Sequence, residues 1–408
     1  GFFFGYMIVA HVLLPLYYKL NLTSIYGYLG TRIGVHTYRT GSFFFLLSRM
    51  LGTAAKLYLV CLILHTHVFQ EMHIPFWVIA VGSVTLVWIY THKSGIKTIV
   101  WTDTLQTFCL IAALLFIIYF TIQKLDTGFD GIVQTIRNSE HSRIFVFDDW
   151  ISRQNFFKQF FSGIFIVIVM TGLDQDMMQK NLSCRNLREA KKNMYCYGFS
   201  FIPLNFLFLC LGILLLALAG QMQLELPAMN DDILPMFATQ GYLGHSVLIL
   251  FTIGIIAAAF SNSDSALTAM TTSVCIDLLN TEKDTEEVAR RKRKRVHLLL
   301  SVLLAFFICL VEMLNNKSVI DAIYIIASYT YGPLLGMFAF GLFPRRQTND
   351  RLVPLIAIAS PVLCYALDWW ISKETGYKFG YELLMLNGSL TFAGIMLLSG
   401  KEKAVKTP

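Results

Sequence analysis

Residues 257–270 read AAAFSNSDSALTAM, and the five polar residues 261–265 stand side by side inside an apolar stretch long enough to cross a membrane. On a helix, positions i, i+3, i+4 and i+7 share one face. The stretch therefore predicts a helix with small and oxygen-bearing side chains in one stripe: Ala258, Ser261, Asp264, Ser265, Thr268 and Thr272.

The stripe has two interpretations. Small residues and hydroxyls let membrane helices approach closely and hydrogen-bond, so one interpretation is a helix–helix seam. An ionised aspartate at the bilayer centre, however, costs about 2.5–3.5 kcal/mol on insertion scales, so it must face protein, water or a cation. Carboxylate, hydroxyl and carbonyl oxygens are the ligands that small hard cations prefer. We favour a cation site, because burying the Asp264 carboxylate in a helix–helix seam would cost free energy without bringing the helices closer together.

The composition is that of an all-α polytopic membrane protein. Of the 408 residues, 55% are hydrophobic and only 14% are charged, whereas soluble proteins carry about 25% charged residues. Apolar windows of about 20 residues predict spans. Eleven are expected, near 1–18, 43–66, 75–91, 96–122, 156–177, 193–220, 244–279, 296–314, 319–343, 352–371 and 381–399.

The charges predict how the chain sits in the cell membrane. Most of the 33 Lys and Arg lie in alternate connections, including 178–192 and the run RRKRKR in 280–295. The positive-inside rule places these connections and the C-terminal tail in the cytoplasm. The net charge of +7 does not indicate nucleic-acid binding, because the basic residues form short segments between apolar runs rather than one face. The eight cysteines show no metal-binding spacing and are expected to be small core residues.

Further acids lie in or near the predicted spans. Asp103 stands in SGIKTIVWTDTLQTF (94–108), where it could be an interfacial or capping acid or a second carboxylate of the cation site. In the polar segment 170–193, Asp174 is expected to lie deeper in the membrane than the other acids. Asp176 is expected near water or paired with Lys180.

Two basic residues could neutralise these acids. Arg49 and Lys56 are seven residues apart, so they share one face of the span 43–66. Arg49 is close to the predicted cytoplasmic side, and we expect it to extend toward the interface. Lys56 is nearer the centre and is a possible charge partner of an acid. A pairing with Asp103 or Asp264 would weaken the cation interpretation.

Five stretches, in this order, resemble the sodium/solute symporter family, the relatives of the sodium–glucose, sodium–proline and sodium–sialic acid transporters. They are LPLYYKLNLTSIYGYLGTRIG (14–34), SGIKTIVWTDTLQTF (94–108), DQDMMQKNLSCRNLREA (174–190), AAAFSNSDSAL (257–267) and YGPLLGMFAFGLFPRR (331–346). The resemblance implies a LeuT-type fold, with two inverted repeats of five helices and broken helices at the centre.

The resemblance also implies an organisation for the chain as a single transmembrane domain, 1–408. Residues 1–122 would hold the second to fifth core helices, 123–155 an extracellular loop that could carry short interfacial helices, and 156–343 the sixth to tenth. Residues 344–408 would add two helices and a cytoplasmic tail. Residue 1 is Gly and the chain starts apolar, so at least one earlier span is expected to be missing. Because 1–18 would correspond to the second core helix, the resemblance implies that the missing span is the first core helix.

Sodium ligands are implied residue by residue. The main sodium site of the family would use the Ala258 carbonyl, Ser261 and the side chain of Asn262. A second site, present in some members, would use Asp103, Asp264 and Ser265. Two neighbouring carboxylates repel unless a cation or a proton lies between them. We therefore expect one or two sodium ions, or a proton in place of the second.

The substrate region is implied by the sixth and tenth core helices. Met170 and Thr171 stand where the sugar carriers have an aromatic pair, which disfavours a hexose. Asp174 matches the acid or amide that follows. The tenth core helix offers Tyr329, Thr330 and Tyr331 as candidate contacts, although tyrosines in membrane spans are more often packing or interfacial residues. The implied partner is a small organic solute, not named by the sequence. The oligomeric state is also left open.

The expected function is sodium-coupled symport of a small solute into the cell by alternating access. A transporter-like sensor without transport is an alternative, and a membrane-embedded enzyme is a further one. The enzyme is disfavoured because neither H-E-x-x-H nor G-x-S-x-G is present and the nine His are scattered.

Overall fold

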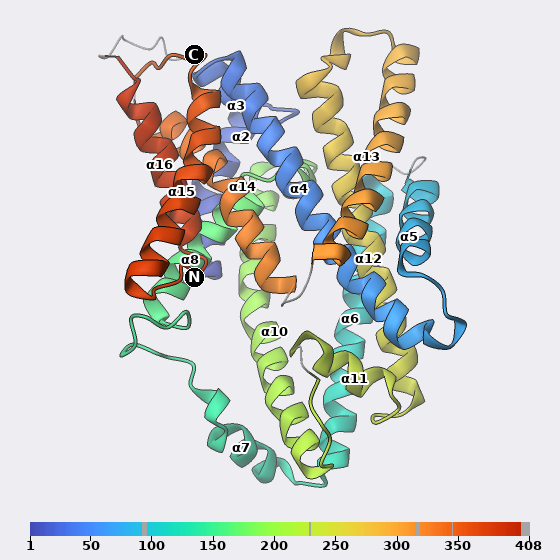
Figure 1. Ribbon diagram of the computed structural model, residues 1–408. Helices are drawn as coiled ribbons and strands as arrows, with labels where there is room; N and C mark the ends of the chain where they lie inside the picture. The colour runs from blue at the N-terminus through green and yellow to red at the C-terminus, as the bar shows by residue number, and fades with distance from the viewer. Residues whose placement is uncertain (92–95, 228–229, 315–318, 345, 401–408) are drawn as a thin grey trace.

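The computed structural model describes residues 1–91, 96–227, 230–314, 319–344 and 346–400, and it is a bundle of helices (Figure 1). The α-helices are α1 (Phe2–Ile8), α2 (Leu14–Leu20), α3 (Gly27–Arg32), α4 (Val35–Ile63), α5 (Phe76–Thr91), α6 (Ile96–Leu125), α7 (Phe129–Asn138), α8 (Phe156–Val167), α9 (Gln175–Leu182), α10 (Leu187–Gln221), α11 (Ile233–Thr239), α12 (His245–Ser273), α13 (Glu286–Leu314), α14 (Val319–Leu342), α15 (Val353–Thr375) and α16 (Leu383–Leu397). Four π-helical turns interrupt or extend them: η1 (Val9–Leu13), η2 (Leu64–Val68), η5 (Ile168–Gly172) and η7 (Val274–Leu278). Among the described residues, the one extended pairing outside the helices is a bridge between Thr348 and Ser399.

The number of full membrane spans is lower than expected. Eight helices of the described chain are long and apolar enough to cross a membrane, or nine if the bent pair α8–α9 counts as one span. Every one of the eleven expected segments is helical, but α5 and α16 have only 16 and 15 residues. A span needs about 20 residues because a helix rises about 1.5 Å per residue across a core of about 30 Å. The expectation of eleven full spans is therefore corrected to eight or nine.

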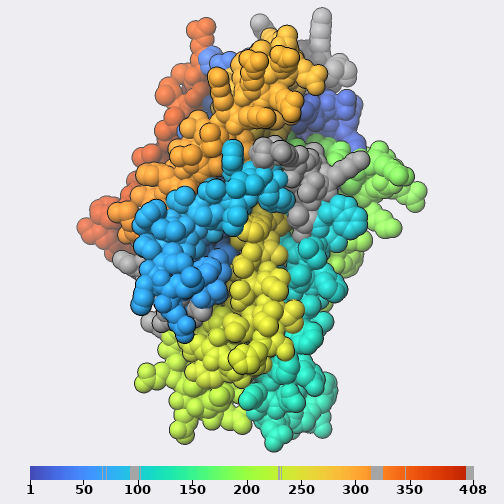
Figure 2. Space-filling view, turned by 90° about the vertical axis from the view of Figure 1, so that its right-hand side faces the viewer, coloured from blue at the N-terminus to red at the C-terminus, as the bar shows by residue number. Residues whose placement is uncertain are grey.

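The long connection 123–155 carries one amphipathic helix, α7. Figure 1 shows α7 at one end of the molecule, while α3, the α12–α13 connection and the C-terminal end of the chain lie at the other. Figure 2 shows part of α12 (yellow) at the surface between the blue segment of α5 and the teal segment of α6. Ile249 and Ile253 of α12 are exposed, whereas Ser261, Asp264 and Ser265 of its polar stripe are buried.

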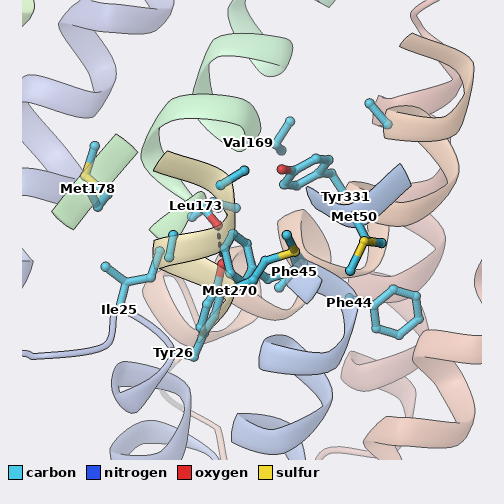
Figure 3. Close-up of a cluster of buried hydrophobic side chains, with 14 of the residues drawn as sticks. Ile25, Tyr26, Phe44, Phe45, Met50, Val169, Leu173, Met178, Met270 and Tyr331 are labelled. Atoms are coloured by element: carbon cyan, nitrogen blue, oxygen red, sulfur yellow. Dashed lines mark hydrogen bonds between the residues drawn. The ribbon is translucent and has the colours of Figure 1, made fainter. Parts of the chain in front are cut away.

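The core gathers around the break between α8 and α9. Ile25 and Tyr26, which follow α2, pack there with Phe45 of α4, and all three side chains are fully buried (Figure 3). Tyr26 and Phe45 lie 5.4 Å apart, measured between ring centroids. These side chains pack against the break between the two halves of the broken span.

The break itself is a 66° bend between Phe156–Gly172 and Gln175–Leu182. A break frees backbone carbonyls that need partners inside a membrane. Tyr17 donates a hydrogen bond to the Gly172 carbonyl at 2.9 Å, and Tyr26 donates one to the Leu173 carbonyl at 2.9 Å (Figure 3). Asp174 then caps α9, since its carboxylate accepts from the amide of Asp176 at 2.9 Å. Two carbonyls at the bend and the first amides of α9 therefore have hydrogen-bond partners within the protein.

Close contact between α14 and α16 depends on glycine. A Cβ atom on Gly332 would lie 2.3 Å from Cγ of Asn387, and one on Gly336 would lie 2.7 Å from the Gly388 carbonyl oxygen. Asn387 is fully buried and donates to the carbonyls of Ser328 and Tyr329, both at 3.0 Å. Small residues and interhelical hydrogen bonds join these two helices, as is usual in membranes.

The first turn of α4 is anchored by a distant acid. Asp350, which lies between α14 and α15, accepts from the amides of His36 and Thr37, both at 2.8 Å. Burial alone would raise the pKa of Asp350, but hydrogen bonds from the Thr37 side chain and from both amides hold it below the ordinary 3.8. Orphan amides at a helix N-terminus favour a negative charge.

Candidate functional site

The polar stripe of α12 faces the interior of the bundle. Ser261, Asp264 and Ser265 are 4%, 0% and 3% exposed, although they lie on a membrane-length helix. Helices α4 and α6 pack against α12. An inward stripe means that the two acids expected at the cation site, Asp103 of α6 and Asp264 of α12, lie on helices in contact.

Asp103 already has a cationic partner. Lys180 of α9 donates to Asp103 Oδ2 at 2.7 Å, and Ser261 donates to the other carboxylate oxygen. Side chains of both ion-pair members are about one-third exposed or less. Lys180, and not Lys56, is therefore the ion-pair partner of Asp103, and the Asp103 carboxylate is not free. Lys180 in turn is not the partner of Asp176.

Only one of the two carboxylate oxygens of Asp264 has a hydrogen-bond partner among the described residues. Tyr90, in the last turn of α5, donates to Asp264 Oδ2. Asp264 Oδ1 and Ser265 Oγ are both buried and have no hydrogen-bond partner among the described residues. A buried polar atom without a partner costs about 1–3 kcal/mol unless a ligand satisfies it. Asp264 Oδ1 and Ser265 Oγ are therefore candidate ligands for a cation.

The remaining members of the expected main sodium site bond to each other. The Asn262 amide nitrogen donates to the Ala258 carbonyl at 2.9 Å. This bond leaves the Asn262 amide oxygen as the atom that could bind a cation. Ala258 also lines an apolar cavity of about 140 Å³ between α6, α10, α11 and α12, together with Leu114, Phe208 and Phe251.

A second charged cluster joins α4 to the bend. Arg49 is only 8% exposed, and its guanidinium pairs with Asp176 of α9 and lies 3.7 Å from Asp174. Tyr331 of α14 donates to Asp174 at 2.6 Å. The expectations that Arg49 extends to the interface and that Asp176 stays near water are wrong. A buried arginine must be paired, and the bend brings the two aspartates to it.

A small cavity lies beside this cluster, and the candidate solute contacts Met170 and Tyr331 line it. It measures about 20 Å³ and is lined by Ser48, Arg49, Gly52, Lys56, Met170, Ile326, Ala327 and Tyr331. Of the expected contacts, Met170 lines it, Asp174 is linked to it through Tyr331, and Thr171 is buried nearby in the chain. Tyr329 does not line it, because its ring lies toward Tyr365 at a centroid distance of 6.5 Å.

Lys56 is notable among the lining residues. It forms no ion pair with an acid of the described chain, and it reaches the cavity together with Arg49. Sequence reasoning missed Tyr90 here, and it gave Tyr331 little weight beside Tyr329. A tyrosine in a membrane helix is ordinarily a packing or interfacial residue, so neither position carried a strong signal.

The chain matches the Sodium:solute symporter family over residues 1–351. This protein therefore belongs to that family, and by class it is a sodium-coupled solute transporter rather than an enzyme. Among curated proteins, it is 27% identical to the sodium/sialic acid symporter NanT of Aliivibrio fischeri, over 94% of this chain and 76% of that one.

Other relatives are longer. Identity is 27% to the sodium-dependent multivitamin transporter of Oryctolagus cuniculus and 24% to the human sodium/iodide cotransporter, and the chain spans 56% of each. The solved outward-open structure of a Na⁺-coupled sialic acid symporter superposes with a TM-score of 0.80 at 21% identity, covering 97% of this chain and 82% of that one. The superposition establishes the shared fold.

Proposed function

We propose that this protein couples sodium entry to the uptake of a small organic anion by alternating access. The observation that carries the solute class is the side chain of Lys56, which lines the cavity without an acidic partner among the described residues. Arg49 is paired with Asp176 and lies 3.7 Å from Asp174, so Lys56 is the basic side chain at the cavity that has no ion-pair partner of its own among the described residues. A carboxylate-bearing solute would complement it.

The names of two relatives support an anion. Sialic acid bears a carboxylate and iodide is an anion, and both stand in the names of sodium-coupled relatives. The apolar side chains of Met170, Ile326 and Ala327 would contact the body of such a solute. Because about 20 Å³ holds no more than a water molecule, the walls from α4, η5 and α14 must separate to admit it.

Sodium would bind at the oxygens that lack donors. Asp264 Oδ1 and Ser265 Oγ form the strongest part of the proposed site, with the Asn262 amide oxygen as a further candidate. Of the expected second site, Asp103 is paired with the ammonium of Lys180, whereas Asp264 and Ser265 keep oxygens without partners among the described residues. We therefore propose a single sodium ion, bound between these oxygens and the Asn262 amide oxygen of the expected main site.

Coupling requires that the ion prefer one conformation. A ligand shifts a two-state equilibrium only by its difference in affinity for the two states. The bent pair is a suitable moving element, because α9 carries both Lys180 and Asp176 and so touches the sodium region and the solute region at once. Outward and inward states would differ in how α9 lies against α6 and α12.

The test is uptake by proteoliposomes with and without an inward sodium gradient. The solute panel pairs each carboxylate, such as lactate or sialic acid, with its uncharged amide. We expect sodium-dependent uptake of carboxylates only, a loss of at least about tenfold in Lys56→Met, and partial retention in Lys56→Arg, since an anion contact is worth more than about 1.4 kcal/mol.

Two results would overturn the proposal. Uptake at the same rate with and without sodium would contradict sodium coupling. Equal uptake of amides and carboxylates would contradict an anionic solute. Tyr329→Phe, whose side chain lies outside the cavity, is the matched control and should transport like the parent.

A further inference from the structure

A wide basic groove lies where α10 begins, beside η1 in the middle of the first span. It measures about 690 Å³ and is lined by His11, Leu187, Arg188, Lys191, Lys192 and Tyr195. Ligand sites commonly measure about 300–1,000 Å³. This groove takes no part in the sodium or solute regions described above, which lie on α4, α12 and the bend.

The groove has a polarity gradient along two antiparallel elements. Arg188 and Lys192 are exposed, and none of the three basic side chains forms an ion pair within the described chain; Glu189 is the acid next to them in sequence. His11 and Tyr195 then meet across the groove, with a hydrogen bond between Nε2 and the hydroxyl. Charge thus gives way to amphipathic rings within two turns of α10.

Beyond these rings the surface is apolar and exposed. On α10, Tyr197, Phe199 and Ile202 are 55%, 60% and 55% exposed, and on the first span Ile8 and Val12 are 37% and 44% exposed. Rings of Tyr6 and Tyr197 lie 5.0 Å apart, so the two elements form one continuous wall. The order of charged, amphipathic and apolar side chains follows the profile of one membrane leaflet.

We propose that this groove binds an anionic phospholipid, with the phosphate at Arg188, Lys191 and Lys192 and the acyl chains along the wall of α1 and α10. The positive-inside rule places residues 178–192 on the cytoplasmic side, where anionic lipids attract basic residues. A concave basic site that opens onto an apolar wall matches a phospholipid better than a free phosphate, which would use only the basic half.

The experiment measures lipid retention by the purified, delipidated chain, using native mass spectrometry with phosphatidylglycerol or phosphatidylcholine as the probe. Each basic residue near an anionic membrane contributes about fivefold to affinity. We therefore expect the parent to prefer phosphatidylglycerol, and the variant Arg188→Gln/Lys191→Gln/Lys192→Gln to bind it on the order of a hundredfold more weakly.

A matched variant separates this groove from general surface charge. Arg290→Gln/Lys294→Gln/Arg295→Gln removes three exposed charges from α13 and should bind phosphatidylglycerol like the parent. The charge-preserving change Arg188→Lys should also retain binding, which guards against loss through misfolding. Equal losses in both triple variants, or no preference between the two lipids, would overturn the proposal.

A second arm tests the source of the phosphate. Inorganic phosphate or glycerol 3-phosphate is added in equal molar amount to phosphatidylglycerol. We expect neither to displace the lipid, because neither can use the apolar wall. Displacement by either would make the groove a site for soluble phosphates and would overturn the assignment to lipid.

Discussion

Arg49 shows how a single residue ties the fold to its site. Its guanidinium is buried, pairs with Asp176 and lies 3.7 Å from Asp174, and its Nε has no partner among the described residues. Removing one member of a buried ion pair costs about 3–5 kcal/mol, because the other charge is left unpaired. Arg49 therefore stabilises the bend as well as shaping the cavity.

We predict that Arg49→Met lowers the unfolding temperature sharply, whereas Arg49→Met combined with Asp176→Asn recovers part of the loss. The reason is that the double change leaves one buried charge fewer. Thermal unfolding in detergent measures both. An additive loss in the double variant would contradict a direct pair between these two side chains.

Ser265 supplies a second prediction at this scale, for sodium. A ligand that binds only the folded state raises the unfolding temperature, so the protein should be stabilised by sodium. Since a bond to a charged group is worth about 1.5–3 kcal/mol, Ser265→Ala should raise the sodium concentration at half effect about tenfold.

Ser263→Ala is the matched control for the sodium titration. Ser263 is equally buried on the same helix but lies off the stripe. Its removal should leave the half-effect concentration unchanged. If both substitutions raised the half-effect sodium concentration equally, the polar stripe of α12 would not be the sodium site.

At the scale of elements, the packing of α14 against α16 is set by glycine. Gly336→Ala should destabilise the protein by about 1–3 kcal/mol, because the new methyl group would meet the Gly388 carbonyl and Thr391. Gly212→Ala on α10, where nothing lies within 4 Å, should instead be neutral or stabilising. The unfolding temperatures of the two variants test this prediction. Equal changes in both would contradict the close approach of α14 and α16.

The anchor of α4 predicts a pH dependence. Because the pKa of Asp350 is below the ordinary 3.8 in the fold, its stabilising contribution is present above that value and is lost as the pH falls through the lower folded-state pKa. Asp350→Asn should lower the unfolding temperature at neutral pH and should show a smaller drop on acidification. Exposed Glu225→Gln is the control, and an unchanged acid slope in Asp350→Asn would contradict the anchor.

At the scale of the whole molecule, the ion count decides the electrical behaviour. Each charge that moves through 100 mV contributes about 2.3 kcal/mol. Two sodium ions with a neutral solute would therefore permit on the order of a thousandfold accumulation. One sodium ion with one monovalent anion carries no net charge and gains nothing from the potential.

We predict that uptake of a monovalent anion is insensitive to a potassium diffusion potential, because Lys180 pairs with Asp103 of the expected second sodium site and one sodium ion is proposed. Lys180→Gln frees Asp103, and it should make uptake depend on both the potential and a higher power of sodium concentration. Potential-dependent uptake by the parent would contradict a single sodium ion.

Several features could be predicted from the sequence because they are local. Each of the eleven apolar segments is helical, and the spacing of Ser261, Asp264 and Ser265 placed them on one face, which the structure buries. Helix periodicity and apolar length depend on residues within a few turns. The number of full spans was overestimated because α5 and α16 are a turn short of a membrane crossing.

The sequence by itself determined the membrane class, the family, the helices and the face of α12 on which oxygen atoms gather. Only the tertiary structure decided which charges meet: Arg49 with Asp176 across 127 positions, and Lys180 with Asp103 across 77. The physical reason is that ion pairing depends on where the bend in α8–α9 directs its side chains, and no local pattern encodes that direction. The same packing leaves Lys56 without an ion-pair partner among the acids of the described chain.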